Sequence, residues 1–181
     1  AKGEQTVGVF LDIKGAFDRL NHKATIQALK RRGLPERFIN WYKQYLENRE
    51  TTVELAGESI TRALTCGTPQ GGVLSPIIWN IVFEEALVAV SDKEFITGFA
   101  DDGCIIVTGK RPEICKRKAQ AAVDIALEWG RKAGLEFNAS KTEVVHFKRK
   151  KFKKPRKILV SGTPVPYSQT AKYLGVTLTY N

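Results

Sequence analysis

The sequence predicts an α+β domain in which helices pack against a largely antiparallel sheet. Segments typical of strands and helices follow one another in mixed order, without the regular alternation of a parallel α/β fold. An Asp-Gly pair between two apolar segments indicates an antiparallel hairpin. The 181 residues, 43% of them hydrophobic, fit one domain with a sizeable core.

The N-terminal third begins with a buried strand. Residues 7–13 are a short apolar run that predicts a central strand covered on both faces, with Asp12 at its C-terminal end. Residues 24–32 predict a helix that Gly33 ends, and Pro35 begins another helix. In that helix, aromatic and aliphatic residues recur at helical spacing and are interpreted as core: Phe38, Trp41, Tyr42, Tyr45 and Leu46.

The middle of the chain combines a hairpin, a loop and a helix. Residues 51–55 and 59–65 predict a hairpin, and a glycine-rich loop follows at 66–72. Ser75 is predicted to cap a helix with Pro76 at its first position, and apolar residues continue that helix to about residue 90.

Two carboxylates lie at the tip of the next predicted hairpin. Strands at 95–100 and 104–108 flank Asp101, Asp102 and Gly103, and the Asp-Gly pair favours a tight turn there. A long helix over 112–132 is expected to end at Gly134. Four short strands are predicted after it, at 135–137, 144–147, 158–160 and 173–178.

Charge and cysteine content restrict the class of partner. The formal net charge of +10 and the pI near 9.6 favour a polyanionic partner, either nucleic acid or an anionic membrane surface. No apolar stretch approaches the roughly 20 residues that a membrane helix needs, so membrane insertion is not expected. The three cysteines form no CxxC pair and no even disulfide framework, which fits a reducing intracellular compartment. Because the chain starts at Ala1 just before a predicted core strand, we expect a fragment of a longer polypeptide.

The three aspartates Asp12, Asp101 and Asp102 are the candidate metal ligands. Taken singly, Asp12 is an ordinary strand-end carboxylate and Asp102 an ordinary turn residue. If folding brings them together, their like charges repel unless a cation compensates, and magnesium prefers oxygen ligands of this kind. Two such ions about 4 Å apart activate an attacking 3′-hydroxyl and stabilise departing pyrophosphate. The expected chemistry is nucleotidyl transfer.

Four motifs appear in a characteristic order: FLDIKGAFD at 10–18, GTPQGGVLSP at 67–76, FADD at 99–102 and GLEFNASKT at 134–142. Together they resemble the reverse transcriptases of non-long-terminal-repeat (LINE-type) retrotransposons, and more distantly those of group II introns. The resemblance spans nearly the whole chain. It implies a right-hand polymerase palm with an antiparallel sheet backed by helices, plus part of the fingers. It also implies that Asp12, Asp101 and Asp102 are the catalytic, metal-binding residues. The chain departs from the family in having Phe99 where Tyr is more familiar.

The resemblance assigns further residues to the site. Phe17 is similar to the family's steric gate, a ring that excludes a ribose 2′-hydroxyl, although core packing is the alternative. Gln70 and Gly71 match the motif that contacts the incoming nucleotide. Lys141 is similar to a lysine that approaches the triphosphate, and we interpret its role as electrostatic assistance. Residues 172–176 resemble the primer grip. Asp18 matches a common family residue without a direct metal role.

The function that the resemblance implies is RNA-directed DNA polymerisation: deoxynucleotides are added to a primer 3′ end. Two Mg²⁺ ions, with Mn²⁺ as an alternative, are the expected cofactors. RNA template, DNA primer and deoxynucleoside triphosphates are the expected partners. Residues 1–181 are interpreted as a single domain fragment that lacks the N-terminal fingers and the C-terminal thumb, and the sequence leaves open whether this fragment is active alone.

Two alternatives stay open at this point. One is a non-catalytic nucleic-acid-binding module derived from the same fold. The other is an RNA-dependent RNA polymerase, against which Phe17 argues because a steric gate excludes ribonucleotides. The basic run at 146–157 fits a solvated loop, a phosphate-contacting segment or a nuclear-localisation patch, so nuclear location stays one reading within an intracellular assignment.

Overall fold

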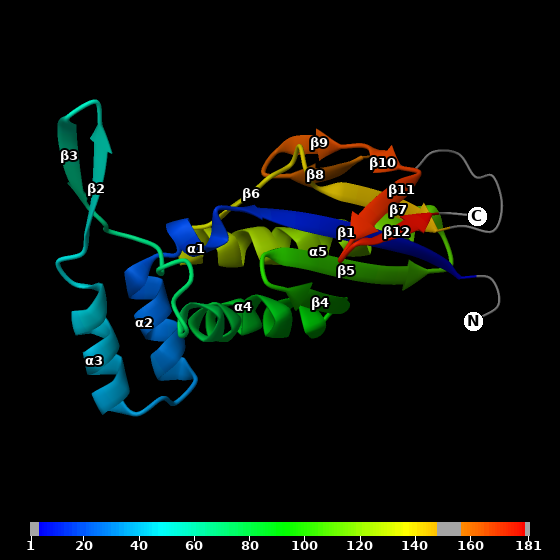
Figure 1. The fold of residues 1–181 in the computed structure, drawn as a ribbon. Helices are drawn as coiled ribbons and strands as arrows, with labels where there is room; N and C mark the ends of the chain where they lie inside the picture. The colour runs from blue at the N-terminus through cyan, green and yellow to red at the C-terminus, as the bar shows by residue number, and fades with distance from the viewer. Residues whose placement is uncertain (1–3, 148–156, 180–181) are drawn as a thin grey trace.

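The computed structural model describes residues 4–147 and 157–179. Its main sheet has the strand order β10-β7-β1-β5-β4, and β6 pairs with the end of β1 (Figure 1). Every pairing in it is antiparallel except β10 with β7. The strands of this sheet are β1 (Gln5–Lys14), β4 (Phe95–Phe99), β5 (Asp102–Gly109), β6 (Glu136–Phe137), β7 (Glu143–Phe147) and β10 (Tyr167–Ser168).

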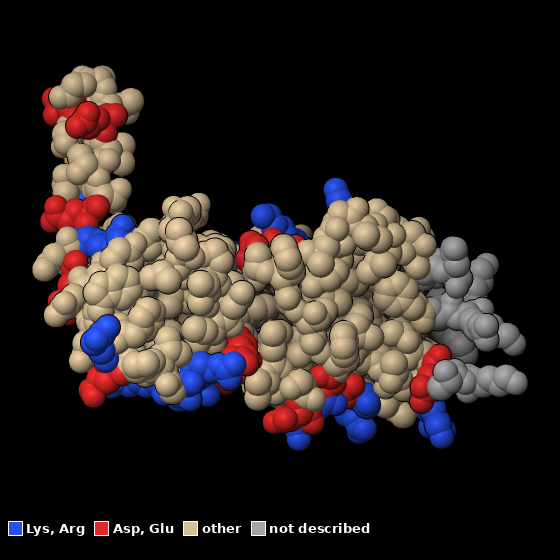
Figure 2. Space-filling view, turned by 60° about the horizontal axis from the view of Figure 1, so that its bottom comes forward, with Lys and Arg blue, Asp and Glu red and all other residues tan. Residues whose placement is uncertain are grey.

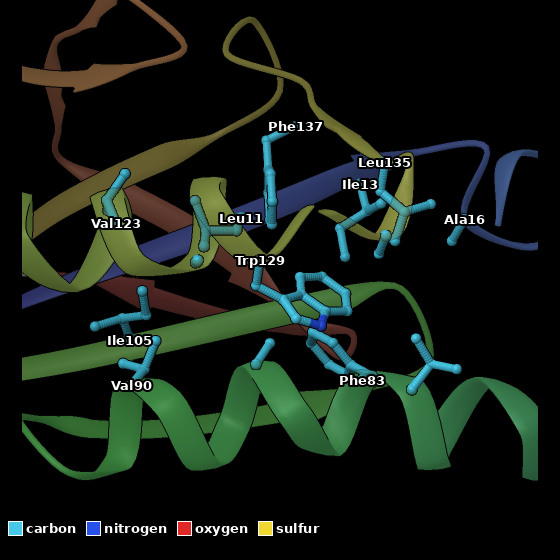
Figure 3. Packing of buried hydrophobic residues seen from close by; sticks show 14 of the residues in the cluster. Leu11, Ile13, Ala16, Phe83, Val90, Ile105, Val123, Trp129, Leu135 and Phe137 are labelled. Carbon is cyan, nitrogen blue, oxygen red and sulfur yellow. The ribbon is translucent and has the colours of Figure 1, made fainter. Parts of the chain in front are cut away.

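Helices cover one face of this sheet. The long helices α4 (Ser75–Ser91) and α5 (Pro112–Ala133) pack there, and their buried side chains meet those of β1 and β5. Figure 3 shows Trp129 of α5 and Phe83 of α4 facing each other near Leu11, and the two rings lie 5.5 Å apart. The predicted α+β fold, with an antiparallel sheet backed by helices, is confirmed.

The opposite face of the sheet is covered by a small hairpin of β11 (Thr170–Tyr173) and β12 (Val176–Thr179). Beneath it, Phe10, Cys104, Val145 and Ala171 form a second buried cluster. Because both faces are covered, β1 is buried along almost its whole length, which explains its continuous apolar sequence. A separate two-stranded sheet joins β8 (Ile158–Val160) and β9 (Thr163–Val165).

The remaining elements form an extension at one end of the sheet (Figure 1). They are α1 (Ala16–Arg19), α2 (His22–Arg31), α3 (Glu36–Leu46), β2 (Glu50–Leu55) and β3 (Glu58–Ala63). The β2–β3 hairpin projects outward with every residue exposed. Figure 2 shows acidic side chains on this projection, so the chain's excess of basic residues lies elsewhere. No helix of the described residues is long and apolar enough to cross a membrane.

The turn expected at Asp102-Gly103 was placed wrongly. Phe99 pairs with Asp102, so the turn residues are Ala100 and Asp101, and Ala100 adopts a positive φ of 51°. Asp102 and Gly103 are instead the first residues of β5. The ladder between β1 and β5 continues through them, and this tertiary pairing outweighs the local turn preference.

Three smaller expectations also need correction. Residues 173–178 are not one strand, because Leu174 and Gly175, both with positive φ, form the turn between β11 and β12. Ser75 does not cap α4; it is the first helical residue, and its hydroxyl donates a hydrogen bond to the Pro69 carbonyl at 2.5 Å. The apolar stripe of α3 is only partly core.

In α3, Tyr42 and Leu46 are buried, but Trp41 is 46% exposed and Tyr45 is 37% exposed. These two rings stack on each other with centroids 5.6 Å apart, and Arg49 lies 5.0 Å from the Tyr45 ring. Because α3 packs mainly on α2, only part of its apolar face is covered.

Candidate active site

Two of the predicted aspartates lie directly opposite each other on neighbouring strands. In the β1–β5 ladder, Asp12 is the partner of Asp102. Side chains opposed in this way have Cβ atoms about 5 Å apart on one face of the sheet. Asp101 is the turn residue that directly precedes Asp102. The fold therefore brings Asp12 beside a carboxylate pair that is distant from it in the sequence.

The electrostatics of the site reflect this convergence. The pKa of Asp102 is raised, first by partial burial and then by the negative charges of Asp101 and Asp12. Ionised Asp102 is thus repelled by both of the other carboxylates, and a bound cation would relieve that repulsion. The donor set consists of carboxylate oxygens, which suit a hard divalent ion. Within the described ranges, no group of three acidic, histidine or cysteine side chains is close enough to count as an assembled metal site.

Lys141 reaches the same site from the loop after β6. Its Nζ lies 3.8 Å from Asp12 Oδ1, and the lysine side chain is largely exposed. Asn138 organises this loop: its main-chain N–H donates to the Asp12 carbonyl at 2.8 Å, and its carbonyl accepts from the N–H groups of Lys141 and Thr142. Sequence reasoning missed Asn138. Its signal is the local Asn-x-Ser turn, in which the Asn138 side chain accepts from Ser140.

Trp79 supports the turn that carries Asp101. It is 1% exposed, and its indole N–H donates to the Ala100 carbonyl at 2.6 Å. The Phe17 ring also packs against the indole, with centroids 5.6 Å apart. Sequence reasoning missed Trp79 as well, because a core tryptophan that bonds to a main-chain carbonyl has no distinctive pattern. Phe17 is partly buried, and its role as a steric gate stays a prediction.

The glycine-rich loop is joined to α1 by main-chain hydrogen bonds. Thr68 N–H donates to the Phe17 carbonyl at 2.7 Å, and Gly67 N–H donates to the Leu20 carbonyl at 2.8 Å. Gly67 has a φ of 87°, and a Cβ added there would lie 2.6 Å from the Asp18 carbonyl oxygen. Only glycine permits so close an approach. The segments that carry Asp12 and Gln70 are therefore fixed relative to each other.

Gln70 and Gly71 are less enclosed. Gln70 is exposed, and its Nε2 donates to Asp18 Oδ1 at 2.8 Å. Gly71 has a φ of 81°, with open space where a Cβ would lie. Gln70 and Asp18 line a cavity of about 440 Å³ together with Arg49 and His22. The loop thus borders a space that could receive a ligand, and its nucleotide contact stays a prediction.

The segment that resembles the primer grip forms the β11–β12 hairpin over the sheet. Tyr173 packs on Phe10 with centroids 5.7 Å apart, and Lys172 N–H donates to Glu143 Oε2 at 3.0 Å. Most of the basic run falls at 148–156, outside the described residues.

Comparison with known proteins identifies the family. Residues 1–178 match the family model described as "Reverse transcriptase (RNA-dependent DNA polymerase)". The chain is 32% identical over 178 residues, or 94% of its length, to a probable RNA-directed DNA polymerase from transposon X-element of Drosophila melanogaster. It is 30% identical over 97% of its length to the RNA-directed DNA polymerase from mobile element jockey of the same species. A putative 115 kDa protein in the retrotransposable element R1DM, also of Drosophila melanogaster, is 26% identical over a similar span. The chain covers only 17% to 20% of these relatives' lengths.

Solved structures support the same fold. Telomerase from Candida tropicalis superimposes with a TM-score of 0.63 over 96% of this chain and 31% of that one, at 14% identity. A second structure of it, in complex with a fragment of telomeric RNA, gives a TM-score of 0.62 over 90% and 28% of the two chains, at 16% identity. These likenesses confirm the expected polymerase fold, and the relatives confirm the resemblance to retrotransposon enzymes. The chain belongs to the reverse transcriptase family.

Proposed function

We propose that this chain carries the polymerase site of an RNA-directed DNA polymerase and adds deoxynucleotides to a primer 3′ end. The observation that carries the proposal is the pairing of Asp12 with Asp102 across β1 and β5, with Asp101 in the adjoining turn. Asp12 and Asp101 both raise the pKa of Asp102 by their negative charges, and such repulsion is costly to hold unless the carboxylates serve a cation. Membership of the reverse transcriptase family, whose members use divalent metal ions, supports the same conclusion.

Asp12, Asp101 and Asp102 are the residues we assign to metal binding. We propose two Mg²⁺ ions, with Mn²⁺ as an alternative, because oxygen-only donors suit both. When bound, such ions would lower the pKa of the primer 3′-hydroxyl and offset the negative charge of the leaving pyrophosphate. The raised pKa of Asp102, caused first by burial and then by its two carboxylate neighbours, supports this assignment.

The other site residues act on the nucleotide. We assign Lys141 to electrostatic stabilisation of phosphate charge, supported by its position 3.8 Å from Asp12 Oδ1 and by the exposure of its side chain. We assign Gln70 and Gly71 to holding the incoming nucleotide, since Gly71 leaves the backbone open to close approach. Phe17 is assigned to excluding the ribose 2′-hydroxyl, and its packing on Trp79 would keep the ring rigid enough to do so.

The proposed partners are an RNA template, a DNA primer and deoxynucleoside triphosphates, all polyanions that suit a chain of net charge +10. We propose that residues 1–181 are the palm with part of the fingers and that further sequence completes the hand. We propose that the protein acts inside the cell, where its nucleic-acid partners are, and that the nucleus is one such location.

Primer extension on an RNA template tests the proposal. The chain, its Asp101→Ala/Asp102→Ala variant and a longer polypeptide with added sequence at both ends are compared with and without Mg²⁺. Extension that requires Mg²⁺ and is lost in the variant would support the polymerase assignment. Activity in the longer polypeptide alone would show that the palm needs its missing parts. Folded protein that binds primer-template but never extends it would favour a non-catalytic binding module, and a preference for ribonucleotides would favour an RNA polymerase.

A further inference from the structure

Asp18 has no part in the metal chemistry proposed above, yet its side chain contacts a residue assigned to the nucleotide. Asp18 Oδ1 accepts a hydrogen bond from Gln70 Nε2 at 2.8 Å. A carboxylate can only accept, and within a carboxamide only the nitrogen can donate. The contact therefore determines which half of the Gln70 amide faces Asp18. The amide oxygen is turned away and is free to accept.

The main chains on both sides of this contact are fixed. Thr68 N–H bonds to the Phe17 carbonyl, and Gly67 N–H bonds to the Leu20 carbonyl. The Cys66 thiol lies 3.3 Å from the Asp18 carbonyl oxygen as a further donor. Because these contacts flank Asp18 and join it to the residues just before Gln70, the two backbones are held close together at this pair. The side-chain rotations of Gln70 remain, and the hydrogen bond to Asp18 restricts them.

This hydrogen bond has little to do with stability. Both residues are exposed, and water competes for exposed polar groups, so such contacts contribute little to the free energy of folding. Orientation is a different matter, since an amide without a partner presents its oxygen and its nitrogen with similar probability. Both residues also line the same cavity of about 440 Å³. The contact thus sets the polarity of one wall of that cavity.

We infer that Asp18 is a positioning residue that holds the Gln70 amide with its oxygen offered to the incoming nucleotide. The inference rests on the proposed function, because Gln70 acts on a nucleotide only if the chain is a polymerase. An oxygen acceptor selects a donor group, which on a nucleotide is a sugar hydroxyl or a base amine. Phosphate oxygens only accept, so the oriented oxygen does not contact the triphosphate.

A spectroscopic comparison tests the orientation without any need for activity. In the chain labelled with ¹⁵N, the side-chain NH₂ signal of Gln70 is assigned by its loss in Gln70→Glu. In Asp18→Ala this signal is expected to shift and to exchange faster with solvent, because the acceptor is gone. Asp124→Ala is the matched control, since it removes a Gln–Asp hydrogen bond of the same 2.8 Å length to Gln120 on α5. A Gln70 signal that is identical in wild type and Asp18→Ala overturns the inference.

Steady-state primer extension, in whichever form of the protein is active, tests the consequence. Asp18→Ala is expected to raise the KM for deoxynucleotide about 3- to 10-fold, the value of one hydrogen bond, with kcat little changed. Asp124→Ala is expected to change neither constant. A fall in kcat with unchanged KM would overturn the positioning role.

A polarity swap separates orientation from general support. Gln70→Glu alone opposes two carboxylates and is expected to raise KM further. In Asp18→Asn/Gln70→Glu, the amide introduced at position 18 donates to one carboxylate oxygen at position 70, and the second oxygen there offers the acceptor again. KM is then expected to recover to within about 3-fold of wild type. No recovery would mean that Gln70 serves through its N–H, which refutes the inference. If neither the chain nor the longer polypeptide extends a primer while the NMR shift is seen, the proposed function fails and the orientation stands.

Discussion

Replacing Trp79 by phenylalanine tests how the aspartate turn is supported. Trp79 is buried in α4, and its indole N–H donates to the Ala100 carbonyl at 2.6 Å. Ala100 holds the left-handed position of the turn, with φ at 51°, and Asp101 follows it. Trp79→Phe keeps an aromatic ring in the core and removes the donor. The turn then loses this hydrogen bond to α4.

The expected cost has two parts. Trading an indole for a phenyl ring vacates roughly 40 Å³, and at about 24 cal/mol per Å³ this costs about 1 kcal/mol if the core does not relax. The lost hydrogen bond adds about 1 kcal/mol. Trp79→Phe should therefore lower the free energy of unfolding by about 2 kcal/mol.

Trp129→Phe is the matched control. Trp129 is also buried, in the same aromatic cluster, and the same volume is lost. Its indole nitrogen, however, has no hydrogen-bond partner among the described residues. Phenylalanine removes that unsatisfied donor, which gains about 1 kcal/mol and offsets the cavity. The expected net change is close to zero.

Equilibrium unfolding in urea, followed by far-ultraviolet circular dichroism, measures both variants without depending on tryptophan fluorescence. The reasoning predicts a difference of about 2 kcal/mol between them, close to a 30-fold difference in the folding equilibrium constant. Equal costs for the two variants would refute it, since the hydrogen bond to the turn would then contribute nothing.

Three further predictions concern the same site. Burial and the neighbouring carboxylates raise the pKa of Asp102, so the folded state binds more protons than the unfolded one between the ordinary and the raised pKa, and stability falls as pH rises through that window. Asp102→Asn should remove this fall and stabilise the metal-free chain at neutral pH, seen as a higher melting temperature; a lower one would contradict the repulsion. Gly67→Ala should cost more than Gly71→Ala, which costs about 1 kcal/mol for its positive φ alone, because only the former meets the Asp18 carbonyl; equal costs in urea unfolding would argue against that contact. Phe17→Ala should raise the ratio of kcat/KM for ribonucleotides to that for deoxynucleotides, and an unchanged ratio would end its assignment as a gate.

The fold was largely readable from the sequence because its strands and helices follow hydrophobic periodicity. Apolar runs predicted β1 and β5, and helical spacing predicted α4 and α5. The errors arose where tertiary contacts override local preference. Asp102 and Gly103 favour a turn by themselves, but pairing with Asp12 and Leu11 takes them into β5. The error at α3 also concerns tertiary contacts. Periodicity shows which face of a helix is apolar, but it does not show how much of that face another element covers.

In the candidate site, too, some residues could be named from the sequence and others could not. The carboxylates that we propose for the chemistry could be named from the sequence, because they stand in recognisable motifs, and their catalytic role stays a prediction. Trp79 and Asn138 could not, because each acts through a main-chain carbonyl or N–H on a distant segment. A main-chain partner has no side-chain identity, so only the folded structure reveals it.

These main-chain contacts explain how repelling carboxylates can be held together before any cation binds. The loop of Asn138 is tied to the backbone of Asp12, the turn of Asp101 to Trp79, and the loop of Gln70 to α1. All three ties are hydrogen bonds of about 3 Å or less that involve no side chain of Asp12, Asp101 or Asp102. These main-chain hydrogen bonds therefore hold the three aspartates near one another against their mutual repulsion. Because these ties hold the backbones in place, the adjustment that a cation would still require is one of side chains, which are not yet close enough to form an assembled metal site among the described residues.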